Sequence, residues 1–204
     1  MTKKRVAILI SGRGSNMMAL VEAAAAPDFP AEIALVLSNR PDASGLAWAS
    51  SRGIRVATVD HKTYGRDREA FERAMQAVLA ENAIDLVCLA GFMRVLTSWF
   101  VSQWQDRMLN IHPALLPSYR GLHTHERALG DGVKVHGCTV HFVVPEMDAG
   151  PIIEQACVRV EDSDDADALA ARVLKEEHRI YPRALALVAG GKVRIEGNRV
   201  MMRA

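Results

Sequence analysis

Short apolar runs that alternate with helical patterns constrain the fold of this chain more than any other feature. Runs of four to six residues read as buried strands at 6–10, 33–37, 54–59, 86–90 and 108–111. Helices are expected between them, at 15–26, 44–52, 67–82 and around Trp99. Continuous apolar strands joined by crossover helices are typical of a parallel sheet that is covered on both faces. We therefore predict an α/β fold with a Rossmann-like, doubly wound and mostly parallel sheet.

The second half of the chain predicts a different arrangement. Expected there are strands at 137–144 and 151–160, a long helix at 163–187, and a terminal hairpin with strands at 193–195 and 199–202. Gly197 and Asn198 lie between the last two strands and favour a tight hairpin turn. These strands are expected to extend the sheet in the antiparallel sense. Because no internal repeat or low-complexity linker interrupts the chain, a single domain is the simplest prediction.

Composition and charge narrow the class of partner. Half of the 204 residues are hydrophobic and the net charge is +1, so no overall field favours nucleic acid or a membrane. The partners are therefore expected to be small molecules. Cys88, Cys138 and Cys157 form no CxxC pair and indicate reduced thiols. The apolar run at 6–10 is too short for a signal peptide, so a cytoplasmic protein is expected.

The sequence SGRGSN at 11–16 directly follows the first expected strand and opens a helix. Backbone N–H groups at a helix N-terminus bind anions, and glycine lets a phosphate approach closely. The third glycine of GxGxxG is missing and no GK[ST] follows, which disfavours a dinucleotide or a nucleoside triphosphate. A phosphate monoester is therefore predicted here. The alternative is a tight strand-to-helix turn with Ser15 as the N-cap.

Asn110 and His112 lie at the end of the fifth expected strand. Side chains two residues apart project to the same side of a strand, and parallel sheets bind ligands beyond the carboxyl ends of their strands. The pair therefore favours an active site over a capped strand end with a hydrogen-bonded core histidine. Asp148 lies in a loop bounded by Pro and Gly, where by itself it reads as a turn aspartate. His141 could equally be a core histidine whose hydrogen bonds are satisfied or a residue of the active site.

Glu177 falls on the apolar stripe of the long expected helix. Its neighbours three and four residues away are Val173, Leu174, Ile180 and Tyr181. An ionised carboxylate among such residues is costly unless it is paired or binds something, so Glu177 is predicted to have a function. Glu176 lies four residues from Arg172 and is predicted to be its exposed partner.

The histidines at 123 and 125 are a possible zinc pair, with His112 and His141 as further ligands. No HExxH motif and no series of carboxylate and histidine residues supports this site, so no metal is expected. Arg94, which follows the fourth strand, could hold an anionic tail.

Taken together, these motifs resemble the glycinamide ribonucleotide formyltransferase family, folate-dependent enzymes of purine synthesis. The matching segments, in family order over nearly the whole chain, are ISGRGSN, LAGFMRVL, NIHPALLPSYRGLHTH, GCTVHFV, MDAGPII and EEHRIYP. The HPxLLP core also suits methionyl-tRNA formyltransferase and formyltetrahydrofolate hydrolase. The glycine-rich loop and GLHTH favour the glycinamide enzymes, and 204 residues leave no room for the extra domains of the other two.

The resemblance implies one formyltransferase domain over residues 1–204, with a phosphate-binding half at 1–111 and a folate-binding half at 112–204. Its implied catalytic residues are Asn110, His112 and Asp148. Positions that match the acceptor-substrate site are Gly14, Ser15, Asn16, Lys175, Glu176 and Glu177. Positions that match contacts to the folate are Arg68, Met93, Arg94, Val95, Leu96, Asn110, Val144, Pro145, Glu146, Met147 and Asp148.

The implied reaction moves the formyl group of 10-formyltetrahydrofolate, a co-substrate, to the amine of 5-phosphoribosylglycinamide. Asn110 and a protonated His112 would stabilise the oxyanion, and Asp148 would favour the charged imidazole. No metal or covalent intermediate is expected. The alternative is a formyltetrahydrofolate hydrolase, in which water replaces the amine. A monomer and a homodimer are both compatible with the sequence.

Overall fold

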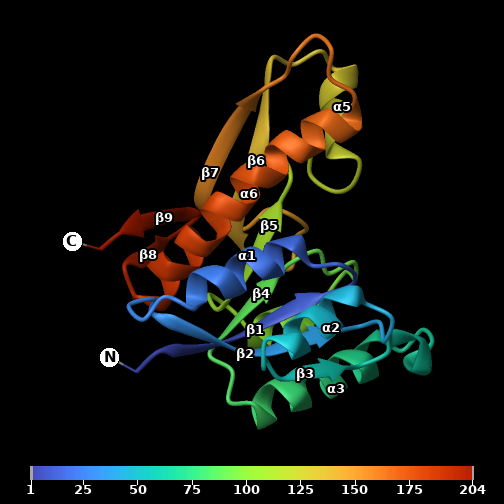
Figure 1. The fold of residues 1–204 in the computed structure, drawn as a ribbon, viewed down its shortest axis with the longest axis vertical. Helices are drawn as coiled ribbons and strands as arrows, with labels where there is room; N and C mark the ends of the chain where they lie inside the picture. The colour runs from blue at the N-terminus through green and yellow to red at the C-terminus, as the bar shows by residue number, and fades with distance from the viewer. Residues whose placement is uncertain (1, 204) are drawn as a thin grey trace.

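Five parallel strands form the first part of the sheet in the computed structural model, which describes residues 2–203 (Figure 1). They are β1 (Lys4–Ile10), β2 (Ala31–Ser38), β3 (Val56–Thr58), β4 (Leu86–Leu89) and β5 (Met108–His112). Their order is β3-β2-β1-β4-β5, and each neighbouring pair is parallel. The five predicted strands are thus confirmed. The order reverses direction between β1 and β4, where open α/β sheets leave a crevice for ligands.

Helices cover both faces of this part of the sheet. These helices are α1 (Ser15–Ala24), α2 (Ser44–Ser51), α3 (Arg68–Glu81), α4 (Ser98–Gln103) and α6 (Ala166–Ala189). Alternate residues of β1 divide the core: Val6, Ile8 and Ile10 pack with α1, α2 and α6, whereas Ala7 and Leu9 pack with α3 and α4. The predicted doubly wound sheet is therefore confirmed.

The remaining strands extend the sheet beyond β5. They are β6 (Val135–Phe142), β7 (Ile152–Arg159), β8 (Val193–Glu196) and β9 (Arg199–Met202). The pairs β5–β6, β6–β7 and β8–β9 are antiparallel, as predicted, while β9 lies parallel to β7. Figure 1 shows β6 and β7 reaching away from the parallel strands, with α6 running beside them.

Helix α6 is fixed on the sheet by a buried tyrosine. The hydroxyl oxygen of Tyr181 lies 3.0 Å from the carbonyl oxygen of Leu89 and 3.1 Å from that of Leu109. Burial raises the pKa of this phenol well above its ordinary value, so the hydroxyl stays protonated and donates to these carbonyls. Because Glu177 is one helical turn from Tyr181, this contact also fixes Glu177 relative to β4 and β5.

Two short helices were not predicted, η1 (His61–Tyr64) and α5 (Thr124–Gly130). Helix α5 begins after His123, whose backbone is left-handed with φ 57°, so its start carries none of the usual N-cap signals. Strand β3 is shorter than predicted, because the N–H of Ile54 donates to the carbonyl of Ala49 and closes α2. No helix in the described part of the chain is long and apolar enough to cross a membrane.

Candidate active site

The glycine-rich loop connects β1 to α1 with a left-handed residue at the helix start. Gly14 has φ 69° and occupies the N-cap position, and no side chain caps this end of α1. The alternative with Ser15 as N-cap is therefore wrong, because the chain turns at Gly14 and Ser15 is already helical. The first N–H groups of α1 have no partner within the helix. They are available to an anion, as the phosphate-loop prediction requires.

Asn16 and Glu177 meet across the interface of α1 and α6. The side-chain nitrogen of Asn16 donates to Oε2 of Glu177 at 2.6 Å, and both residues are buried. Burial raises the pKa of the Glu177 carboxyl, and the hydrogen bond from Asn16 partly opposes that shift. The amide oxygen of Asn16 is buried without a partner among the described residues. Such an acceptor is one that a bound ligand can satisfy.

The neighbours of Glu177 lie apart from this contact. Glu176 pairs with Arg179 at 2.6 Å, whereas Arg172 forms a bidentate pair with Asp164 at 2.6 and 2.8 Å. The predicted pairing of Glu176 with Arg172 is wrong, because Asp164 precedes α6 and offers two oxygens in the fork geometry that Arg prefers. Lys175 is exposed, and its side chain makes no hydrogen bond or ion pair within residues 2–203.

The structure brings Asn110, His112 and Asp148 together. Nδ1 of His112 lies 3.5 Å from Oδ2 of Asp148, and both side chains are almost buried. Nε2 of His112 lies 2.9 Å from the carbonyl oxygen of Tyr119. Both ring nitrogens therefore face oxygen acceptors, and only the protonated ring has a hydrogen for each.

His141 completes this cluster from β6, directly across from Asn110. Its Nδ1 lies 2.9 Å from the carbonyl oxygen of Phe142, and its Nε2 lies 3.3 Å from Nδ2 of Asn110. Burial lowers the pKa of His141, so the neutral ring donates through Nδ1 and accepts from Asn110 through Nε2. This contact turns the amide nitrogen of Asn110 toward the cluster. Nε2 also lies 3.8 Å from Oδ1 of Asp148.

The loop after β5 holds Asp148 through its backbone. The N–H of Gly121 donates to Oδ2 of Asp148 at 2.9 Å, and the same loop supplies the Tyr119 carbonyl. Tyr119 and Asp148 both have left-handed backbones, with φ 54° and 51°. Sequence reasoning missed these contacts. Their only sequence signal was the segment SYRGLHTH, which carries no periodicity.

The predicted folate-contacting residues lie on two exposed segments. Met93 and Val95 are 68% and 56% exposed, Arg94 is half-buried, and Leu96 packs partly against the core beside α3 and α4. The segment ends at Thr97, whose N–H donates at 2.7 Å to the buried carboxylate of Glu72 on α3. Exposed apolar side chains on a fixed segment suit a planar ligand.

The other predicted folate contacts are less closely grouped. Arg68 is exposed at the first position of α3. In the loop after β6, Val144 is half-buried, whereas Pro145, Glu146 and Met147 are exposed. Glu146 pairs with Arg120 at 2.6 Å.

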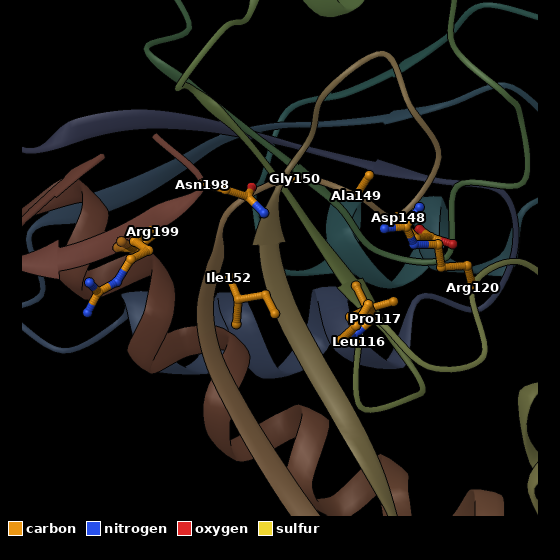
Figure 2. A pocket seen from close by; sticks show the side chains of 10 residues that line it. Leu116, Pro117, Arg120, Asp148, Ala149, Gly150, Ile152, Asn198 and Arg199 are labelled. Atoms are coloured by element: carbon orange, nitrogen blue, oxygen red, sulfur yellow. The ribbon is translucent and has the colours of Figure 1, made fainter. Parts of the chain in front are cut away.

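Two cavities adjoin these residues. One, of about 320 Å³, is lined by Ser11, Gly12, Asn39, Arg40, His61, Gly91, Met93 and Arg94. The other, of about 310 Å³, opens beside Asp148 (Figure 2) and is lined by Leu116, Pro117, Arg120, Asp148, Ala149, Gly150, Ile152, Asn198, Arg199 and Val200. Figure 2 shows that the loop holding Asp148 and the hairpin turn at Asn198 border the same hollow.

Two further histidines, His125 and His136, pack against each other. The rings of His125 and His136 meet edge to face at 5.2 Å, and His136 also meets Tyr119 at 5.8 Å. Burial lowers the pKa of both imidazoles, that of His136 to about 4. Within residues 2–203, no three His, Cys, Asp or Glu side chains are placed to hold a metal ion.

Comparison with known proteins places the chain in a family. Residues 4–185 match the Formyl transferase family. The phosphoribosylglycinamide formyltransferase of Escherichia coli is 43% identical over 193 residues, which cover 95% of this chain and 91% of the E. coli protein. The structure of glycinamide ribonucleotide transformylase 1 from Symbiobacterium toebii superposes with a TM-score of 0.95 at 44% identity, covering 98% of this chain and 94% of that one. This chain belongs to the phosphoribosylglycinamide formyltransferase family.

The family also includes a longer relative. The human trifunctional purine biosynthetic protein adenosine-3 is 49% identical over 196 residues, and the chain spans 19% of its length. Membership confirms the predicted family and the predicted enzyme class, a formyltransferase. The division of the domain at residue 111 stays a prediction.

Proposed function

We propose that this formyltransferase moves the formyl group of 10-formyltetrahydrofolate to the amine of 5-phosphoribosylglycinamide. The products are tetrahydrofolate and formylglycinamide ribonucleotide, in cytoplasmic purine biosynthesis. The observation that carries the proposal is the meeting of Asn110, His112 and Asp148 at the carboxyl end of β5, with Nδ1 of His112 3.5 Å from Asp148. Membership of the family supports the choice of substrates.

The acceptor substrate is assigned to the interface of α1 and α6. Its phosphate would bind the N–H groups after Gly14, where no side chain caps the helix. Its ribose or amine would reach Asn16 and Glu177, which are hydrogen-bonded to each other, and could satisfy the amide oxygen of Asn16, which has no partner among the described residues. Lys175 and Glu176, on the same helix, are assigned to the rim of this site.

The folate is assigned to the exposed segments around the cluster. Its ring system would lie against residues 93–96 and the loop 144–148, because the first segment exposes apolar side chains and the second holds Asp148. Arg94 and Arg68 are cations within residues 2–203 that form no ion pair there, so they suit the carboxylates of the folate tail.

Chemistry follows from placing the formyl carbon at this cluster. The acceptor amine attacks it, forming a C–N bond and converting the formyl oxygen to an oxyanion. Nδ2 of Asn110, directed by His141, donates a hydrogen bond to that oxygen, and the positive charge of the protonated His112 stabilises it. One such donor is worth about 2.7–4 kcal/mol of barrier. The bond to N10 of the folate then breaks as the carbonyl reforms.

One proton must move from the amine to N10 during this reaction. The carboxylate of Asp148, which the backbone N–H of Gly121 holds by a hydrogen bond, accepts the proton that the amine loses. The protonated His112 donates a proton to the leaving nitrogen, and Asp148 then passes its proton to the imidazole, so that both groups return to their starting states. Holding both substrates side by side lowers the entropic part of the barrier.

The test is an absorbance assay for tetrahydrofolate release, or release of a deaza analogue, with and without glycinamide ribonucleotide. Release is expected only when the acceptor is present, and formylglycinamide ribonucleotide should form in equal amount. Release at the same rate without acceptor would identify a hydrolase instead. No release in either mixture would remove the proposal.

A further inference from the structure

Residues 39–45, which form the connection between β2 and α2 and the first two residues of α2, lie directly against the glycine-rich loop. We propose that Asn39 and Gly45 are positioning residues, which set the loop that binds the acceptor's phosphate. Asn39 also sets the segment that contacts the folate. This inference rests on the proposed function, because it assumes that the two loops serve those two substrates.

Gly45 contacts the glycine-rich loop through its backbone. Its N–H donates to the carbonyl oxygen of Gly12 at 3.1 Å. A Cβ at this position would lie 2.9 Å from the carbonyl oxygens of Gly12 and Arg13, and 2.7 Å from Cδ1 of Ile10. Two of these three atoms belong to the main chain, which cannot rotate away as a side chain can. Only glycine therefore fits between α2 and the loop.

The choice of glycine here runs against the needs of the helix. Gly45 is the second residue of α2, and glycine within a helix costs roughly 0.5–1 kcal/mol relative to alanine. Its backbone is not left-handed, so no turn demands it. The close approach of the loop is the remaining physical reason for a glycine. A methyl group would push Gly12 and Arg13 outward and displace the N–H groups that follow Gly14.

Asn39 acts on the same loop through a hydroxyl. It is 2% exposed, and its Oδ1 accepts a hydrogen bond from Oγ of Ser11 at 2.6 Å. The same Oγ accepts a hydrogen bond from the N–H of Met93 at 2.7 Å. Ser11 therefore joins the start of the glycine-rich loop to the start of the folate segment, and Asn39 fixes the direction of its proton. All three residues line the 320 Å³ cavity.

The two residues should consequently differ in what they control. Of the two segments proposed to bind substrate, Gly45 approaches the glycine-rich loop, so a change there should affect the acceptor alone. Asn39 orients a hydroxyl that serves both loops, so a change there should affect acceptor and folate together. A purely structural role would lower stability without separating the two substrates in this way.

The first experiment measures KM for glycinamide ribonucleotide and for formyl folate, together with kcat, in Gly45→Ala. The acceptor KM is expected to rise about tenfold or more, since small displacements of positioning groups have effects of that size. The folate KM and kcat should stay within twofold. Gly130→Ala is the matched control, because its Cβ would meet nothing within 4 Å, and it should leave all three constants unchanged.

The Ile10→Val background separates the apolar contact from the loop contact. It removes the Cδ1 atom that lies 2.7 Å from the new methyl group but leaves both carbonyl contacts. The raised acceptor KM should persist in Ile10→Val/Gly45→Ala, which also serves if Gly45→Ala alone does not fold. A normal acceptor KM in either folded variant would overturn the role of Gly45.

The second experiment compares Asn39→Ala, Ser11→Ala and the double variant. Each single change should raise both KM values, and the double variant should be no worse than the worse single variant, because both remove the same hydrogen bond. Additive effects, or a change in one KM only, would overturn the role of Asn39. If the wild-type enzyme itself shows no acceptor-dependent turnover, the proposed function fails, which these comparisons distinguish from failure of the positioning roles.

Discussion

The turn after β1 and the cluster beside β5 present different parts of the chain to the substrates that we propose for them. After β1, the groups that face a ligand are main-chain N–H groups, shaped by Gly14 at φ 69° and by the absence of a side-chain cap. Beside β5, they are side chains from β5, from β6 and from the loop with Asp148. The first region depends on backbone shape and the second on the chemical identity of each side chain.

This difference predicts opposite sensitivities. A backbone site should tolerate changes of side-chain chemistry but not an added Cβ at its glycines. A side-chain site should respond to the loss of a single nitrogen or oxygen while the fold stays intact. Variants of the two regions can therefore be compared for catalysis, substrate affinity and stability.

The largest effect is expected in the side-chain cluster. His112→Ala and Asp148→Asn should each lower kcat by about 10²–10⁴-fold, the usual contribution of a positioned acid or base. Binding of a folate analogue, measured by calorimetry, should survive. Asp162→Asn, on an exposed residue that pairs only with Lys134, is the control and should keep normal turnover. Near-normal kcat in either site variant would refute its role.

The effect of Glu177→Gln should be intermediate between the effects of changes in the side-chain cluster and in the glycine-rich loop. The loss of a charged hydrogen-bond partner should raise the acceptor KM by about tenfold or more, since such bonds contribute roughly 1.5–3 kcal/mol. The variant tests whether the side chain of Glu177 contributes to acceptor binding in addition to the main-chain N–H groups that follow Gly14. Glu81→Gln, an exposed residue at the end of α3, is the matched control.

The same variant should also make the stability of the protein less dependent on pH. Because burial raises the pKa of Glu177 in the folded protein, the folded state holds the proton more strongly than the unfolded state. Wild-type stability should therefore fall as the pH rises from the ordinary glutamate value through the raised pKa. Glutamine does not ionise, so urea unfolding of Glu177→Gln should show a smaller decline. An unchanged pH dependence would contradict the buried, ionising carboxylate.

Gly14→Ala should test the backbone site. A left-handed backbone costs a residue with a Cβ about 1–2 kcal/mol, and the new methyl group would lie 3.3 Å from Ile10 and Met17. The melting temperature should fall and the acceptor KM should rise. Gly53→Ala has a similar φ of 74° with nothing within 4 Å, so it should lose stability without affecting the KM. Equal acceptor KM values in the two variants would contradict a backbone phosphate site at Gly14.

The smallest effect is expected in the pH dependence of stability. It arises from His136, which packs against Tyr119 in the loop that supports the cluster. Burial lowers the pKa of His136 to about 4 from its ordinary value of 6.5, so the unfolded state binds the proton more readily. Stability should therefore be lost as the pH falls from about 6.5 toward 4. His136→Phe keeps an aromatic ring against Tyr119 but does not titrate, and its urea midpoint should decline less between pH 7 and 5. Exposed His123→Gln should behave as the wild type.

Much of this arrangement was readable from the amino-acid sequence, because periodicity is a local property. Alternating runs predicted the parallel strands, the covering helices and the terminal hairpin. Strand alternation predicted that Asn110 and His112 share a side, and helical spacing predicted that Glu177 points inward. In each case a residue's neighbours within four positions carry the information.

Only the tertiary structure decided which distant residues meet. Asp148 reads by itself as a turn residue, and His141 as core or site with equal ease, until the pairing of β5 with β6 brings both to His112. The N-cap at Gly14, the partner of Arg172 and the contacts of Asn39 and Gly45 likewise depend on loops whose path no period predicts. Local sequence determines the shape of each element, whereas the paths of the loops and the contacts between elements follow from how those elements pack.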